Sequence, residues 1–397
     1  MKYIKLGELC DLQNGFAFKS SDYVKNSNTL NCRMSNIRPG AIFDLFYNPK
    51  YLPDNFSKKY SEFLLNDGDI VIAMTDLAGD PKILGVPAQV KTEGKKVLLN
   101  QRVGKLIIKD PNLDFRYLKY VLSNPRNKDY YKKFSGGGLQ INISKKDILN
   151  LEIPLHESNE QIIIADKLDI IQALIDNKNK QINMLNQLIK SQFVEMFVKQ
   201  FWNNEVTIED VCETMKIGPF GSALHKNEIS TSGDVFVLGT DNAVDNEFKI
   251  YEKRFITIQK YNELSKYEVK PGDIIISMMG TIGRTSIIPN DLGPAIISSH
   301  LCYLTPNKTL ISSEFLHYTL KYNDSIFYQI DKQKKGAIMS GLNLKIIKSL
   351  KFDLPPIELQ NKFAQIVEQI NKQKYEFEKS LKKIEELQAA LMQEYFG

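Results

Sequence analysis

The sequence predicts an α+β protein made of two tandem copies of one α+β unit, joined by two long helices that pack as an antiparallel coiled coil. Three observations support this prediction. The two halves of the chain repeat the same segments in the same order at an offset of about 200 residues. Each half mixes short β-rich runs with short helical segments. Each half then closes on a long run that contains neither Gly nor Pro.

The repeat is visible in four pairs of segments. They agree in order, spacing and residue class, so chance is a poor explanation. The pairs are Ile4-Lys5-Leu6-Gly7-Glu8-Leu9-Cys10 with Val206-Thr207-Ile208-Glu209-Asp210-Val211-Cys212, Gly68-Asp69-Ile70-Val71-Ile72-Ala73-Met74 with Gly272-Asp273-Ile274-Ile275-Ile276-Ser277-Met278, Tyr117-Leu118-Lys119-Tyr120-Val121-Leu122 with Phe315-Leu316-His317-Tyr318-Thr319-Leu320, and Ile153-Pro154-Leu155 with Leu354-Pro355-Pro356.

Within each half, turn residues separate the expected elements. β-rich runs bounded by Gly, Pro, Asn and Asp predict strands at 69–75, 103–108, 235–238 and 273–278. Apolar residues at helical spacing predict helices at 115–122 and 315–322, and a further short helix is expected near Lys145 and near Lys345.

The closing runs at 161–200 and 357–396 carry a narrow apolar stripe that is typical of a coiled-coil seam. A 40-residue helix is about 60 Å long, which exceeds the width of a small domain. Antiparallel packing returns the C-terminus to the first domain and relates the halves by a pseudo-two-fold axis, whereas parallel packing would require a return path of about 60 Å. We therefore expect a first globular domain at 1–155, a spacer helix at 156–200, a second globular domain at 201–355 and a second spacer helix at 356–397.

Composition excludes several classes of protein. No apolar run is long enough to span a bilayer or resembles a signal peptide, so we expect a soluble cytoplasmic protein with no membrane partner. Four scattered cysteines and four histidines favour buried thiols over a metal site. Residues 1–155 hold 24 basic and 16 acidic side chains, a net charge of +8, whereas residues 201–355 hold 17 and 18, a net charge of −1. Only the first domain has the bulk charge typical of a phosphate-binding protein; the second needs its cations clustered on one face.

Two similar heads on a spacer of constant length are suited to reading a bipartite target on double-stranded DNA. Equivalent faces of the duplex recur every 34 to 36 Å or so, and a two-fold protein mirrors the spacing of half-sites. Heads that differ in sequence would read different half-sites, which predicts an asymmetric target.

The ordered set of motifs resembles the DNA-specificity subunit of type I restriction-modification systems over the whole chain. The resemblance rests on the repeated Gly-Asp strands, on the proline-led starts of the long helices with Glu160-Gln161 and Leu359-Gln360, and on two glycine-containing loops. These loops are Ser135-Gly136-Gly137-Gly138-Leu139-Gln140-Ile141-Asn142 and Gly336-Ala337-Ile338-Met339-Ser340-Gly341-Leu342-Asn343; the second has Ser340 where the first has Gln140.

The resemblance implies a non-catalytic subunit with no cofactor of its own. It also implies two modification subunits that bind S-adenosylmethionine and methylate adenine, and two ATP- and Mg-dependent restriction subunits recruited through the complete assembly. Two equivalent surfaces on a pseudo-two-fold chain are suited to holding two copies of one partner.

Arg, Lys, Asn and Gln on loops are the side chains best suited to reading base edges, and lysines near glycine loops are suited to phosphates. In the first head the candidate DNA contacts are Arg33, Asn36, Arg38, Thr75, Lys82, Arg102, Lys132, Lys133, Gln140 and Lys145. In the second head they are Thr240, Asn242, Thr281, Arg284, Lys334, Lys335 and Ser340. The alternative for each arginine is a surface ion pair, and for the glycine loops a structural turn with solvated lysines.

Two other classes of function stay open from the sequence. The first is a self-contained methyltransferase or nuclease with an unrecognised site, although no phosphate-binding Gly-x-x-x-x-Gly-Lys-Ser/Thr motif is present. Glu93-Gly94-Lys95 and Glu268-Val269-Lys270 have the Glu-x-Lys spacing of some nucleases but are better explained as turn residues. The second is a structural tether whose heads bind proteins.

Overall fold

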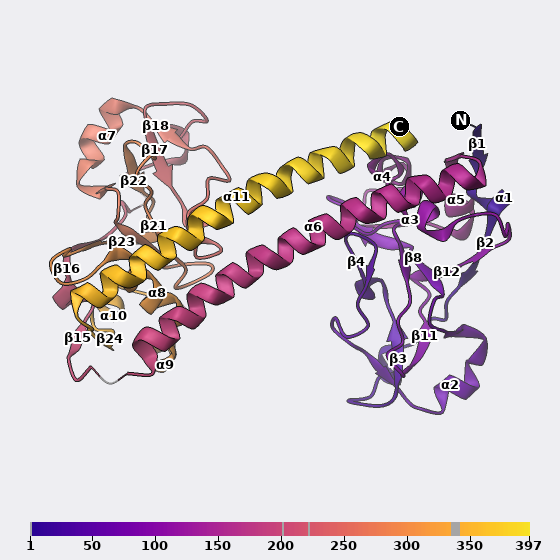
Figure 1. Cartoon of the computed structure of the whole chain (residues 1–397), viewed down its shortest axis with the longest axis horizontal. Coiled ribbons are helices and arrows are strands. Elements are labelled where there is room, and N and C mark those ends of the chain that lie inside the picture. Colours follow the sequence, from indigo (N-terminus) through magenta and orange to yellow (C-terminus); the bar gives the residue numbers. More distant parts are fainter. Residues whose placement is uncertain (1, 201, 221–222, 335–341) are drawn as a thin grey trace. The chain divides into compact units, whose positions relative to one another are not determined.

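The computed structural model describes residues 2–200, 202–220, 223–334 and 342–397. The chain divides into two compact units (Figure 1). Unit 1 comprises Met1–Asn179 with Ser380–Gly397, and unit 2 comprises Lys180–Lys379. Each unit therefore contains one of the two sequence repeats together with parts of both long helices.

Unit 1 is built on two four-stranded sheets and three two-stranded ladders. The first sheet has the antiparallel order β10-β8-β12-β2, with strands at Pro87–Gln89, Ile70–Ala73, Val103–Ile108 and Cys10–Asn14. The second has the order β6-β3-β11-β7, with strands at Tyr51–Leu52, Thr29–Cys32, Lys96–Leu99 and Leu64–Leu65, and its β3 and β11 run parallel. The ladders pair β1 (Lys2–Lys5) with β14 (Glu152–Leu155), β4 (Ile37–Arg38) with β5 (Ile42–Phe43), and β9 (Thr75–Leu77) with β13 (Gln140–Asn142).

Unit 2 repeats both four-stranded sheets strand for strand. The order β21-β20-β23-β16 has strands at Thr285–Ile287, Ile274–Ser277, Leu301–Pro306 and Cys212–Ile217. The order β18-β17-β22-β19 has strands at Phe255–Ile256, Val235–Leu238, Ala295–Ile297 and Glu268–Val269, and its β17 and β22 are again parallel. β15 (Glu205–Thr207) pairs with β24 (Lys351–Asp353), as β1 pairs with β14. The predicted duplication is thus confirmed at the level of topology.

Short helices cover one face of the first sheet in each unit. In α3 (Phe115–Ser123), Tyr117, Leu118 and Val121 recur at helical spacing and are buried, and Asp114 caps the helix by accepting from the Arg116 and Tyr117 amides. The predicted helices at 115–122, at 315–322, and near Lys145 and Lys345 are all present. The other short helices are α1 (Leu6–Leu9), α2 (Phe56–Lys59), α4 (Pro125–Lys132), α5 (Lys145–Leu149), α7 (Ile258–Leu264), α8 (Ser313–Tyr322), α9 (Asp324–Lys334) and α10 (Leu344–Lys348).

The two long helices run antiparallel within each unit. In unit 1 the start of the first long helix packs against the end of the second, with Leu168 and Phe396 in one buried cluster. In unit 2 the end of the first packs against the start of the second, with Phe193 and Phe363 5.7 Å apart between ring centroids. Leu387 belongs to the apolar stripe predicted in the run 357–396 but is 51% exposed, so it departs from the predicted seam. The helices are α6 (Ser158–Phe193), which continues as a π-helical turn at Val194–Val198, and α11 (Ile357–Phe396).

A buried glutamine performs the same task at the start of each long helix. The Gln161 side chain accepts from the Asp114 amide at 3.0 Å and donates to the His156 carbonyl at 2.9 Å. Gln360 likewise accepts from the Ser312 amide at 2.9 Å and donates to the Pro355 carbonyl at 2.8 Å. Both amides tie a long helix to the N-terminal cap of the neighbouring short helix, which explains why the Glu-Gln and Leu-Gln pairs recur in the sequence.

Candidate nucleic-acid interface

A surface hollow of about 510 Å³ in unit 1, which we call the basic hollow, gathers three cations at one sheet edge. Because β3 and β11 are parallel, the residues that follow both strands emerge at the same edge. The Asn100 amide donates to the Cys32 carbonyl at 3.1 Å, which joins the two exits. The hollow is lined by Arg33, Lys50 and Arg102 together with Phe18, Ser20, Tyr23, Met34, Asn100 and Gln101.

Among the residues that the structure describes, no carboxylate lines the basic hollow. Within the part of the chain that the structure describes, none of its three cations forms an ion pair with Asp or Glu. Arg33 Nη1 is buried without a hydrogen-bond partner among the described residues. Three uncompensated cations in one concave surface attract a polyanion and favour DNA phosphates.

Asn36, predicted as a base-reading residue, is instead a buried structural residue. It is 2% exposed, and its side chain accepts from the Arg33 amide at 2.8 Å. Its amide nitrogen donates to the Asp44 and Leu45 carbonyls at 2.9 and 3.1 Å. With its hydrogen-bonding groups satisfied internally, Asn36 holds the turn that presents Arg33 rather than facing DNA.

Thr75 is also interior, whereas two other predicted DNA contacts of the first head line a second surface hollow. Thr75 is 2% exposed, and its hydroxyl donates to Asn142 Oδ1 at 2.7 Å. The hollow, of about 720 Å³, includes Arg38 and Lys82. The Arg38 guanidinium lies 3.6 Å from the centroid of the Tyr47 ring, and Lys82 forms only a highly exposed pair with Asp80 at 3.8 Å.

The predicted lysines around the first glycine loop do not converge on one site. Lys132 pairs with Asp129 at 2.9 Å, and Lys145 pairs with Asp11 at 2.7 Å, where it holds the pKa of the Asp11 carboxyl below its usual value. Lys133 lies 5.7 Å from the Tyr130 ring centroid. Gln140 is half-buried in β13, opposite Leu77 of β9. Lys132 and Lys145 therefore form surface ion pairs, which contribute little to stability, and are not the solvated lysines of the alternative interpretation.

The turn after β17 in unit 2 copies the turn after β3, including its buried asparagine. Asn242 is 2% exposed; it accepts from the Gly239 amide at 2.8 Å and donates to the Lys249 carbonyl at 2.7 Å. Asn242 is thus a second correction to the predicted DNA contacts, for the same reason as Asn36. Thr240 is half-buried at the start of the 3₁₀ turn Thr240–Ala243.

The charge of this region differs between the units. Arg254 precedes β18 as Lys50 precedes β6, but Arg254 forms an ion pair with Asp241. A glycine occupies the position of Arg33, and a Cβ on Gly239 would lie 2.7 Å from Arg254 Nη2, so the guanidinium fills the space of the missing side chain. The cation in unit 2 is therefore compensated, in agreement with the −1 charge of its segment.

The remaining candidates of unit 2 lie on exposed turns or outside the described residues. Thr281 and Arg284 are exposed in the turn after β20, where the Ser277 hydroxyl accepts from the Arg284 amide at 2.9 Å. The side chain of Lys334, and Lys335 and Ser340 entirely, lie outside what the structure describes. Asn343 caps α10 as Ser144 caps α5, and the Leu342 and Ile143 amides bond to the Met278 and Met74 carbonyls. These matches shift the loop alignment by one residue from the predicted pairing of Gln140 with Ser340.

Three residues in or beside the two turns were not predicted from the sequence: Lys50, Asp241 and Arg254. Lys50 and Arg254 precede two-residue strands, and nothing in their local sequence distinguishes them from other surface cations. Lys50 is far from Arg33 in sequence, and the pairing of β3 with β6 brings the two together. In the same way, the pairing of β17 with β18 brings Arg254 close to Asp241. The one available signal is the repeat itself, which aligns the two strands.

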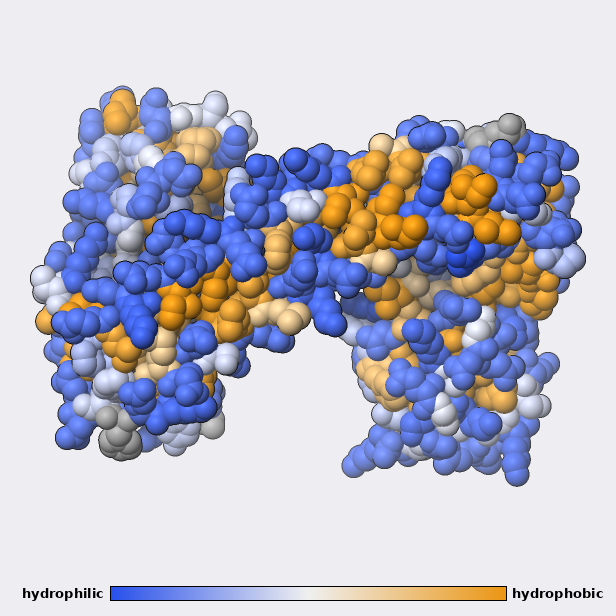
Figure 2. All heavy atoms as spheres, viewed as in Figure 1, coloured by the Kyte–Doolittle hydropathy of each residue, from blue (hydrophilic) through white to orange (hydrophobic). Residues whose placement is uncertain are grey.

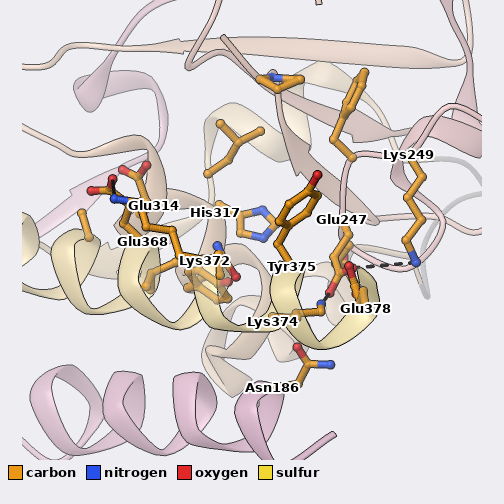
Figure 3. Close-up of a pocket in the computed structure, with 18 of the residues that line it drawn as sticks. Asn186, Glu247, Lys249, Glu314, His317, Glu368, Lys372, Lys374, Tyr375 and Glu378 are labelled. Atoms are coloured by element: carbon orange, nitrogen blue, oxygen red, sulfur yellow. Dashed lines mark hydrogen bonds and ion pairs between the residues drawn. The ribbon is translucent and has the colours of Figure 1, made fainter. Parts of the chain in front are cut away.

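Each unit also has a hollow between its own α-helices and the loop after the asparagine turn. In unit 2 it measures about 900 Å³ and includes Glu247, His317 and Lys374 (Figure 3). Lys374 forms an ion pair with Glu247. His317 is buried and lies 3.0 Å from Thr285 Oγ1, and burial lowers its pKa to about 3 because the imidazolium loses its hydration. Neither a cluster of three potential metal ligands nor a helix able to cross a membrane occurs among the described residues.

The whole repeat matches one known family. The sequence model of the type I restriction modification DNA specificity domain matches twice, at residues 1–187 and 202–389. The chain belongs to this family. The two matches coincide with the two copies of the paired-sheet fold, so the family's domain is the unit that is duplicated here.

Named relatives of the family agree. The type I restriction enzyme MjaVIII specificity subunit of Methanocaldococcus jannaschii is 32% identical over 45% of this chain and 41% of its own length. The type I restriction enzyme EcoBI specificity subunit of Escherichia coli is 22% identical over 92% of this chain and 78% of its own. The crystal structure of the type I restriction-modification S subunit from M. genitalium aligns over 100% of this chain and 96% of its own, with a TM-score of 0.57 and 17% identity. That structure supports the fold.

Proposed function

We propose that this chain is the DNA-specificity subunit of a type I restriction-modification enzyme, in which each unit reads one half of an asymmetric bipartite target on double-stranded DNA. The basic hollow carries this proposal, because it is a concave cluster of cations, without carboxylates, at a loop-bearing sheet edge. The family match supports the assignment to a specificity subunit. The turns after β3 and β17 differ in charge, which supports half-sites that differ in DNA sequence.

The test compares the salt dependence of DNA binding by the full chain and by an Arg33→Gln, Arg102→Gln variant. Each phosphate contact contributes about 0.9 to the slope of log affinity against log salt concentration, so losing two contacts lowers the slope by roughly 1.8. The matched control is Lys132→Gln, Lys145→Gln, which removes the same charge from residues already paired with carboxylates. A wild-type slope in the Arg variant, or an equal loss in the control, would contradict the assignment of the basic hollow.

We propose further that the chain itself is non-catalytic and recruits two methyltransferase subunits, which bind S-adenosylmethionine, and through the assembly two restriction subunits that use ATP and Mg. Methylation that depends on target sequence, measured with the chain reconstituted with modification subunits from its own host, tests this assignment. Methylation or cleavage by the isolated chain would instead favour the self-contained enzyme, and the absence of any salt-dependent affinity for DNA would favour the protein tether.

Matching surfaces in the two units support two copies of one partner. The 900 Å³ hollow of unit 2 and a hollow of about 520 Å³ in unit 1 use the same elements. Tyr120 of α3 and Tyr318 of α8 line them, as do Gly40 and Asn246 after the asparagine turns. Apolar side chains also gather over the long helices in both units (Figure 2), and α6 exposes Ile162, Ile163, Ile170, Leu174, Met184 and Leu188.

A further inference from the structure

Two exposed leucines stand at the tip of the β9–β13 ribbon of unit 1. Leu139 is 90% exposed and Leu77 is 61% exposed. Both line one surface hollow of about 720 Å³, and the Ala78 amide donates to the Leu139 carbonyl at 3.0 Å, which ties the end of β9 to the start of β13. A pair of large apolar side chains presented to water is a feature of surfaces that another molecule covers.

The ribbon beneath the leucines is firmly attached to the core of unit 1. Ile141 is fully buried in that core, and its register partner Asp76 is 8% exposed. Asp76 Oδ2 accepts from the Ile83 and Leu84 amides at 2.6 and 3.1 Å. The leucines are therefore held in place by main-chain pairing on one side and by a buried carboxylate on the other.

The charges around the leucines are suited to a phosphate backbone on either side of an apolar contact. Arg38 and Lys82 line the same hollow as Leu77 and Leu139, and the acidic residues Asp76 and Asp80 line it as well, with the Asp76 carboxylate already bonded to the Ile83 and Leu84 amides. Asp80 is 80% exposed and 3.8 Å from Lys82, so it screens that lysine only weakly. The short segment from Arg33 to Arg38 connects this hollow to the basic hollow, because Arg33 lines one and Arg38 lines the other.

We propose that Leu77 and Leu139 form a wedge that inserts between two neighbouring base pairs of the bound duplex and kinks it, while Arg38 and Lys82 contact the flanking phosphates. This inference rests on the proposed function, since it requires that unit 1 binds double-stranded DNA. Apolar wedges of this kind partly unstack a base step and bend DNA away from the minor groove in which they are inserted. Recognition by unit 1 would then depend on how easily the contacted step deforms, in addition to direct contacts with bases.

The test uses the full chain and a duplex that carries the methylated target found by sequencing the host methylome, with 2-aminopurine placed in turn at each position of the first half-site except the methylated adenine. We expect the wild-type chain to raise the fluorescence of 2-aminopurine severalfold at one base step only. The Leu77→Ala, Leu139→Ala variant should lose this rise and bind about 10-fold more weakly, a difference of about 1.4 kcal/mol. Leu139→Phe, which keeps a large apolar tip, should retain the rise.

The control is Ile107→Ala, because Ile107 is an apolar residue of unit 1 that is 43% exposed on a different strand, β12. It should leave both fluorescence and affinity unchanged. DNA binding by the wild type without a fluorescence rise at any step, or an unchanged rise in the double alanine variant, would overturn the wedge and leave the specificity function standing. Failure of the wild type to bind its own target would overturn both proposals.

Discussion

The turns that follow β3 in unit 1 and β17 in unit 2 share a frame and differ in charge. Asn36 and Asn242 close the two turns with the same hydrogen bonds, and both β3 and β17 pair in parallel with a strand of the same sheet. Unit 1 then places Arg33 and Lys50 there without a carboxylate, whereas unit 2 places Gly239 and an Arg254–Asp241 pair. A duplicated frame can therefore hold its geometry with buried groups while its surface charge diverges.

The largest effects are expected from the aromatic residues that join a long helix to each unit. Phe193 and Phe396 are each 1% exposed, and Phe→Ala substitutions in a core cost about 3–5 kcal/mol. Phe193→Ala should therefore destabilise unit 2 and Phe396→Ala unit 1. The chain's single tryptophan, Trp202, is partly buried against the core of unit 2, so its fluorescence during denaturant unfolding reports that unit alone.

Hydrogen exchange of the α3 peptides, read by mass spectrometry, reports unit 1 in the same samples. Phe396→Ala should leave the fluorescence midpoint near the wild-type value and weaken protection in α3. If both variants shifted both probes equally, the two units would unfold as one cooperative body.

The shared asparagines are expected to contribute equally to their units. Asn36→Ala and Asn242→Ala each remove bonds to main-chain groups inside a turn, which costs about 1–3 kcal/mol through the unpaired groups left behind. The fluorescence midpoint should fall for Asn242→Ala alone, and exchange in β3 should rise for Asn36→Ala alone. A variant that kept full stability but lost affinity for DNA would indicate that the substituted asparagine contacts DNA directly.

The effect that is smallest near neutral pH is the response of the two units to acid. The pKa of His317 in unit 2 is lowered to about 3 by burial, from an ordinary value of 6.5, whereas unit 1 has Lys119 at the matching position. Below pH 6.5 the His317 side chain binds a proton in the unfolded chain, whereas in the folded chain it stays neutral until the pH approaches 3. The free energy of unfolding of unit 2 should therefore fall by about 1.4 kcal/mol per pH unit as pH drops from 6 towards 4.

The measurement is denaturant unfolding of unit 2 followed by Trp202 fluorescence at pH 7, 6 and 5. The carboxylates titrate in wild type and variant alike, so the difference between wild type and His317→Gln isolates the histidine. A gap between the two that does not change with pH would show that His317 binds protons equally in the folded and the unfolded chain, and would contradict the lowered pKa.

Sequence reasoning succeeded where the signal is periodic or repeated. The apolar spacing in 115–122 and 315–322, and the Gly- and Pro-free runs at the ends of both halves, predicted helices that the structure confirms. The candidate site was harder to predict, because Asn and Thr on a turn look alike whether they face solvent or the interior. Asn36, Thr75 and Asn242 are interior, and their partners lie between 3 and 67 positions away along the chain.

Local composition and the repeat thus determined the fold class, the duplication, the antiparallel helices and the excess charge of the first half. Only the tertiary structure decided which cations converge, because the parallel pairing of β3 with β11 brings Arg33 beside Arg102 across a large separation in sequence. It likewise decided that Asp241 compensates Arg254. The physical reason is that secondary structure follows from neighbours along the chain, whereas the electrostatic character of a surface depends on which distant strand ends share one sheet edge.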